Sequence, residues 1–225
     1  MSDTAPPPPP VRLPFADRTE AGRLLGDRLA AELGPLDRDA GVVLGLPRGG
    51  VVVAAEVAER LGLPLDVLVV RKLGLPWRPE LAMGAIAGGG VVVRNETVIR
   101  RSGVAPADVA AVVAAEQAEL DRRERTYRGD RPPVSSAGRL AVLVDDGLAT
   151  GATARAALRA VRAAGASRVL LAVPVAPRDA DVGDEADRLV ALARPRPFGA
   201  VGQHYRDFTA TTDDQVRAAL ALAGP

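Results

Sequence analysis

Two adjacent carboxylates, Asp145 and Asp146, lie between an apolar run and a loop of small residues. Residues 140–144 are aliphatic, which predicts a buried strand. The loop at 147–151 has little side-chain bulk, so its backbone N–H groups could close around an anion, helped by the start of the alanine-rich helix that follows. Carboxylates repel phosphate and instead accept hydrogen bonds from the vicinal hydroxyls of a sugar. The pattern therefore predicts a site for a sugar phosphate.

The sequence VLVDDGLATGAT at residues 142–153 resembles the signature with which type I phosphoribosyltransferases bind phosphoribosyl pyrophosphate (PRPP). A plain strand-loop-helix turn is the alternative, and a Walker loop is excluded because no Gly-Lys-Ser/Thr follows. The resemblance implies that the two acids hold the ribose diol. It implies that the substrate also contacts the rest of the loop: Ala149, Thr150, Gly151, Ala152 and Thr153.

Ala149 departs from one branch of that family. Hypoxanthine-guanine-type members carry an aspartate there that handles a purine ring nitrogen, and alanine can neither accept nor donate that proton. The acceptor is therefore expected to be adenine-like, pyrimidine-like or unusual.

A second strand-turn-helix unit occurs where residues 41–46 lead into Pro47-Arg48-Gly49-Gly50 and an apolar helix at 51–61. This is the geometry for a second anion site beside the first. The resemblance assigns Arg48, Gly49 and Gly50 to the pyrophosphate, and implies a cis peptide bond between Pro47 and Arg48. Taken alone, Arg48 would be interpreted as a solvated arginine.

Residues 65–71 (LDVLVVR) predict a further buried strand, which would deliver Arg71 and Lys72 to the same carboxyl edge of the sheet. Their charges would there stabilise the departing pyrophosphate. Lys72 is the single lysine among 29 basic residues, either by chance or because a compact ammonium is needed there.

Two segments compete as a lid over this site. Residues 74–90 are rich in glycine and proline, are expected to form a loop without regular structure, and occupy the position of the family's flexible catalytic loop. Residues 122–138 begin with the charged run RRERTYRGDRPP, for which a solvated helix face is slightly favoured over a lid.

Aromatic residues gather at 198–208 (FGAVGQHYRDF), which suggests a flat ligand or, alternatively, a small satellite core. The resemblance implies a hood over a nucleobase, with Phe198 or Tyr205 stacking on it and Asp207 contacting Mg²⁺ through water. His204 is interpreted as a surface residue.

Strands and helices alternate along the chain, which predicts an α/β fold with a mostly parallel, doubly wound sheet. Residues 1–14, with prolines at 6–10, are expected to be a disordered tail. Residues 15–225 are expected to form a single domain, with its core at about 41–195 and a small hood from 15–35 and 196–225.

Composition narrows the function classes. The 225 residues include no cysteine and no apolar run of about 18 residues, and their net charge is +1. Disulfides, membrane spanning and nucleic-acid binding are thus not expected, and we expect a cytoplasmic protein that binds a small molecule.

The resulting hypothesis is a phosphoribosyltransferase that uses Mg²⁺-bound PRPP, passes the phosphoribosyl group to a nitrogen acceptor and releases pyrophosphate. Its catalytic residues would be Arg71, Lys72, Asp145 and Asp146. We also expect a homodimer. The alternatives are a non-catalytic regulatory protein that binds PRPP or nucleotides, and a sugar-phosphate hydrolase on the same scaffold.

Overall fold

A five-stranded parallel sheet forms the centre of the molecule in the computed structural model, which describes residues 11–222. Its order is β2-β1-β6-β7-β8, and every neighbouring pair is parallel. The strands are β1 (Gly41–Gly45), β2 (Leu65–Val67), β6 (Leu140–Val144), β7 (Arg168–Val175) and β8 (Arg188–Ala193). The expected α/β fold with a mainly parallel sheet is confirmed.

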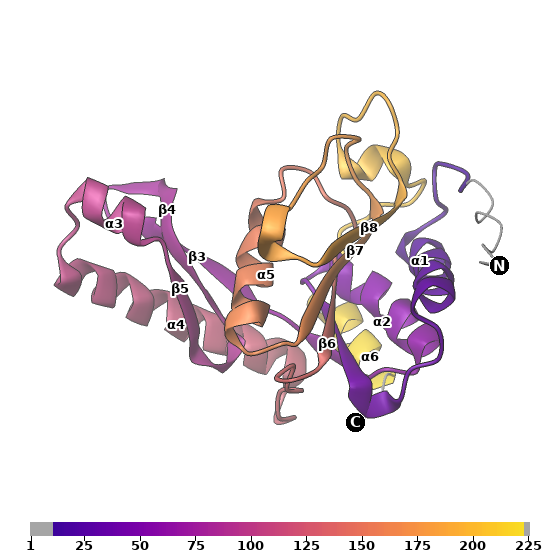
Figure 1. Cartoon of the computed structure of the whole chain (residues 1–225), viewed down its shortest axis with the longest axis horizontal. Coiled ribbons are helices and arrows are strands. Elements are labelled where there is room, and N and C mark those ends of the chain that lie inside the picture. Colours follow the sequence, from indigo (N-terminus) through magenta and orange to yellow (C-terminus); the bar gives the residue numbers. More distant parts are fainter. Residues whose placement is uncertain (1–10, 223–225) are drawn as a thin grey trace, which may run out of the picture.

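Both faces of this sheet are covered, which explains why its central strands are continuous apolar runs. Val43 and Val142 face the core formed with α1 (Arg18–Leu33) and α2 (Gly49–Leu61). The residues next to them along each strand point to the other face of the sheet, where they form a second core with α5 (Ala152–Ala163). Figure 1 shows these helices on the two sides of the sheet.

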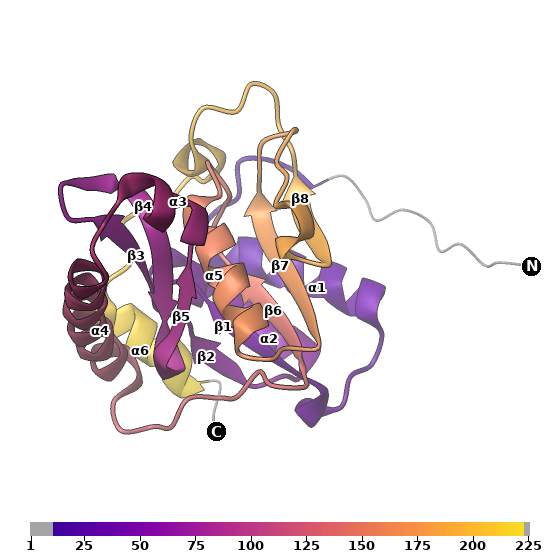
Figure 2. The same ribbon diagram turned by 60° about the vertical axis from the view of Figure 1, so that its left-hand side comes forward.

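A second sheet occupies the segment for which a long irregular loop was expected, so that expectation is wrong. It is antiparallel, in the order β3-β4-β5, and consists of β3 (Val70–Leu75), β4 (Arg78–Ala87) and β5 (Val91–Arg94). Its glycines permit close strand approach instead of marking a loop, since a Cβ on Gly84 would lie 2.4 Å from the carbonyl oxygen of Val93. The expected strand at 65–71 is accordingly split between the two sheets, as β2 and β3 (Figure 2).

The charged run at 122–128 is helical, as the favoured interpretation held, because α4 extends over Pro106–Arg128. Residues 129–138 then lead to the start of β6, at the end of the sheet opposite its carboxyl edge. They therefore do not cover the acid pair. The remaining elements are α3 (Glu96–Ser102), α6 (Asp213–Leu222) and the short 3₁₀ turns η1 (Arg38–Ala40), η2 (Gly88–Gly90), η3 (Gly183–Glu185) and η4 (Val201–His204).

Segments near the two ends of the described chain, around Phe15 and Tyr205, meet beside β7. Phe15 pairs with Tyr205 as in a parallel sheet, and both pack against Val175 in a small apolar cluster. Val11 and Leu13, which were assigned to the tail, pack against this cluster, whereas residues 1–10 lie outside the described part. Helix α6 lies elsewhere, against α2 and α4 (Figure 2).

No helix within residues 11–222 combines the length and the apolar character that a membrane crossing needs.

Candidate functional site

The two predicted loops form one site. A Cβ on Gly49 would lie 2.0 Å from Oδ2 of Asp146, and one on Gly50 would lie 2.8 Å from Cα of Asp145. Only glycine allows the start of α2 to approach the acids this closely. The peptide bond between Pro47 and Arg48 is cis, as the resemblance implied. The acid pair and the turn at residues 47–50 are thus in direct contact.

Asp146 is held by residues from both ends of the chain. Its Oδ2 accepts a hydrogen bond from Nε of Arg18 at 2.9 Å, and its backbone oxygen accepts one from the Tyr205 hydroxyl at 2.6 Å. The Arg18 guanidinium also lies 4.0 Å from the ring centroid of Phe208 and donates to the backbone oxygen of Thr209. Sequence reasoning missed Arg18, which carries no motif and lies 128 positions from its carboxylate partner.

The surroundings of the acid pair disfavour its charged form. Burial, and next the charge of Asp146, raise the pKa of Asp145 well above the usual carboxyl range. Burial also raises the pKa of Asp146, while the hydrogen bond from Arg18 opposes this. Hydroxyl donors or a cation placed at the pair would relieve the repulsion.

The loop after the acid pair ends at Gly151, whose φ of +75° is a left-handed conformation that favours glycine. Helix α5 begins at the next residue, and no side chain caps it. Ala149, Thr150, Ala152 and Thr153 are exposed around this helix start. The first N–H groups of α5 and the two threonine hydroxyls can therefore serve an anion.

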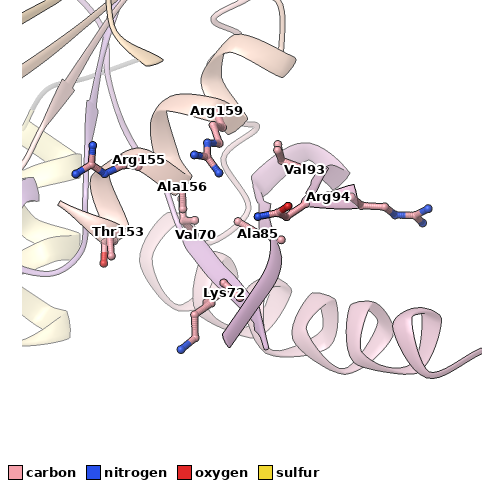
Figure 3. A pocket seen from close by; sticks show the side chains of 13 residues that line it. Val70, Lys72, Ala85, Val93, Arg94, Thr153, Arg155, Ala156 and Arg159 are labelled. Carbon is pink, nitrogen blue, oxygen red and sulfur yellow. The ribbon is translucent and has the colours of Figure 1, made fainter. Parts of the chain in front are cut away.

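Lys72 lies on the wall of a cavity of about 360 Å³ between the second sheet and α5, and Ala152 and Thr153 line the same cavity (Figure 3). Arg48 lines a different one. Lys72 thus lies beside the start of α5 rather than the turn at residues 47–50. Its ammonium is 3.6 Å from Glu80.

Arg71 does not accompany Lys72. Its guanidinium lies 2.6 Å from a carboxylate oxygen of Glu116 on α4, because successive side chains of a strand point to opposite faces. The expectation that strand 65–71 would bring both cations to the carboxyl edge of the central sheet is therefore wrong. Both residues belong to β3 in the second sheet.

The aromatic segment is partly a packing unit. Tyr205 is 5% exposed, with its ring centroid 5.0 Å from that of Phe208, so it positions Asp146 and offers no free face for stacking. Phe198 is half-buried, and its ring lies 5.2 Å from that of His204. His204 is only 9% exposed, so the interpretation as a surface residue is wrong.

The carboxylate of Asp207 accepts hydrogen bonds from the backbone N–H and the hydroxyl of Thr209, at 2.9 and 2.6 Å. These bonds lower the pKa of Asp207. Residues 11–222 contain no group of three or more acidic, histidine or cysteine side chains that could enclose a metal ion. The water-mediated contact of Asp207 with Mg²⁺ stays a prediction.

Comparison with known proteins agrees with this geometry. Residues 19–193 match the model of the phosphoribosyl transferase domain. The chain is 53% identical over 211 residues to a Mycobacterium tuberculosis protein named "Putative phosphoribosyl transferase Rv0571c", covering 93% of this chain but 47% of that protein. It therefore spans about half the length of the curated relatives it matches. The crystal structure of the Thermus thermophilus protein TT1426 superposes with a TM-score of 0.83 at 45% identity, over 94% of this chain and 99% of the other. The chain belongs to the phosphoribosyl transferase family.

Proposed function

We propose that this chain transfers the 5-phosphoribosyl group of PRPP to a nitrogen acceptor and releases pyrophosphate. The observation that carries the proposal is the contact of the acid pair with the turn at Gly49 and Gly50. Together with the uncapped start of α5, this contact gives one site a diol acceptor and two anion-binding turns. PRPP carries a vicinal diol between two phosphorylated positions and matches that arrangement.

Each part of the site has a distinct role in this reaction. Asp145 and Asp146 accept hydrogen bonds from the ribose hydroxyls, the start of α5 holds the 5-phosphate, and the turn carrying Arg48 holds the pyrophosphate. The anomeric carbon becomes cationic as the leaving group departs, so the chain contributes by positioning and by placing charge. Lys72 contributes its positive charge from the side of the 5-phosphate.

Mg²⁺ is part of this proposal. The paired carboxyl groups provide the oxygen ligands that Mg²⁺ prefers, and a bound cation would favour their ionised forms against the burial that raises both pKa values. Such an ion would neutralise charge on the pyrophosphate as it leaves.

The acceptor is proposed to be a nucleobase or related heterocycle, excluding the hypoxanthine-guanine type because Ala149 offers no proton-handling group. Phe198 is the side chain that remains partly exposed to stack on it. The homodimer and the cytoplasmic location stay predictions.

The test combines PRPP binding by calorimetry with a nucleobase screen that measures pyrophosphate release in the presence of Mg²⁺. Turnover by the parent protein that is lost in Asp145→Asn supports the proposal. A parent protein that does not bind PRPP refutes it. PRPP binding without turnover for any acceptor would identify a regulatory protein. Release of phosphate from sugar phosphates without an acceptor would identify a hydrolase.

A further inference from the structure

We propose that Arg122 and Arg123 of α4 bind the pyrophosphate end of PRPP together with Arg48. The proposal rests on the proposed function and assigns a substrate role to the charged run of α4, which no motif covers. It extends the pyrophosphate subsite from the glycine turn to a helix more than 70 positions later in the sequence.

The three arginines line one cavity of about 280 Å³. The other side chains that line it are Thr126, Tyr127, Asp213 and Pro47, so its apolar surface is limited to Pro47 and the ring of the largely buried Tyr127. Such a lining disfavours a nucleobase, which needs apolar surface, and favours a small, highly charged anion. The cavity beside Lys72 also has cationic lining residues, Lys72, Arg94, Arg155 and Arg159, but alanine and valine make up six of its thirteen lining residues (Figure 3).

The position of this cavity fits the leaving group. Pro47 and Arg48 line it directly, and Gly49, the next residue, contacts Asp146. Helix α2 begins there without a side-chain cap, so its first N–H groups remain for an anion. The start of α6 is already satisfied, since Thr212 and Gln215 exchange hydrogen bonds at 2.8 and 3.2 Å. Figure 2 shows α4 and α6 side by side next to the central sheet.

The arginines keep donors for a ligand. Arg123 donates through Nε to Glu119 at 2.8 Å, and Arg122 donates to the same carboxylate through Nε and Nη2 at 2.7 and 2.9 Å. A guanidinium has five N–H donors, so terminal nitrogens remain on both. Glu119 thereby orients the pair, and the two arginines lower its pKa to about 2.

The one carboxylate in the lining does not close the site. Nη1 of Arg48 lies 3.8 Å from Oδ1 of Asp213, which is beyond hydrogen-bonding distance. Arg48 can therefore exchange this loose ion pair for a phosphate oxygen, with which a guanidinium forms two parallel hydrogen bonds.

The test measures binding of Mg²⁺-pyrophosphate and, separately, of ribose 5-phosphate to the full chain by calorimetry. The variants are Arg122→Gln, Arg123→Gln and the double variant, and Arg125→Gln serves as a matched control. Arg125 is an exposed arginine on the same helix and does not line the cavity. We expect pyrophosphate affinity to fall about tenfold for each arginine removed, while ribose 5-phosphate affinity and the control stay unchanged.

Equal pyrophosphate affinity in the double variant and in Arg125→Gln would overturn the inference and leave the proposed function standing. An equal loss for both ligands would also overturn it, since that result indicates a general effect on the fold. The single variants preserve the comparison if the double variant does not fold. A parent protein that binds neither pyrophosphate nor PRPP would refute the proposed function as well.

Discussion

Replacing Asp145 with asparagine should stabilise the ligand-free protein at high pH while removing PRPP binding. Burial and the neighbouring carboxylate raise the pKa of Asp145 from 3.8 to about 8. As pH rises from about 4, the unfolded chain loses this proton first, so ionisation favours the unfolded state until the folded-state pKa is reached. The stability contributed by the protonated group is therefore lost between about pH 4 and pH 8, and asparagine does not titrate.

The size of the effect follows from that difference. Each unit between the folded and unfolded pKa values corresponds to about 1.4 kcal/mol, which bounds the pH 5 to pH 8 effect at about 4 kcal/mol. The charge of Arg18, which lowers the pKa of Asp145, and water that enters a site open to ligand reduce this cost. We expect the gain in unfolding free energy of Asp145→Asn to be larger at pH 8 than at pH 5 by about 1–3 kcal/mol.

Urea unfolding of both proteins at the two pH values measures this gain, and calorimetry measures PRPP affinity. Asp39→Asn is the control, because the Asp39 side chain is 94% exposed. A stability difference between the Asp145 variant and the parent that is the same at pH 5 and pH 8 would show that Asp145 is not held protonated in the folded state. Undiminished PRPP affinity would show that it does not hold the diol.

Substitutions at four further residues test other contacts. Gly49→Ala places a methyl group 2.0 Å from Oδ2 of Asp146, so calorimetry should show at least about tenfold weaker PRPP binding, and parent-like affinity would exclude this packing. Tyr205→Phe removes the hydrogen bond to the Asp146 backbone oxygen. Urea unfolding should then show an unfolding free energy lower by about 1 kcal/mol, and the KM for PRPP should rise. An unchanged KM would limit the role of Tyr205 to packing. Lys72→Met should raise the KM for PRPP about tenfold, because Lys72 lies on the side of the proposed 5-phosphate site, whose charge does not change during transfer, and Lys72→Arg should recover part of the loss. Arg71→Gln should change stability and leave kcat unchanged, because Arg71 pairs with Glu116 on α4. If the Lys72 variants keep the parent's KM, the single lysine does not contribute to substrate binding.

The sequence predicted those parts of the fold that depend on short-range pattern. The apolar run before Asp145, the small residues after it and the turn at Gly49 encode their geometry within a few positions. The second sheet was missed because its glycines were interpreted as breakers, although Gly84 is needed for close packing between strands. The predicted position of Arg71 was wrong because residues 65–71 were interpreted as one strand, whereas the chain passes from the first sheet to the second within that range.

Contacts between distant segments were beyond the reach of sequence pattern. Nothing near Arg18 marks it as the partner of a carboxylate 128 positions away, and the exposed charges of α4 give no indication that two of them line a cavity with Arg48. Tyr205 was singled out for its aromatic ring, yet its contribution to the acid pair comes through its hydroxyl.

The hydrogen bonds to Asp146 also determine how far the chain can be truncated before the candidate site loses contacts. The family match spans residues 19–193 and so contains the whole PRPP signature, but Arg18, Tyr205 and Phe208 lie outside it. A fragment trimmed to the matched residues would keep both acids and lose the side chains that fix one of them in place. The residues that match the family model therefore cover less of the chain than the candidate site does, and an expressed fragment should begin before Phe15 and continue past Thr209.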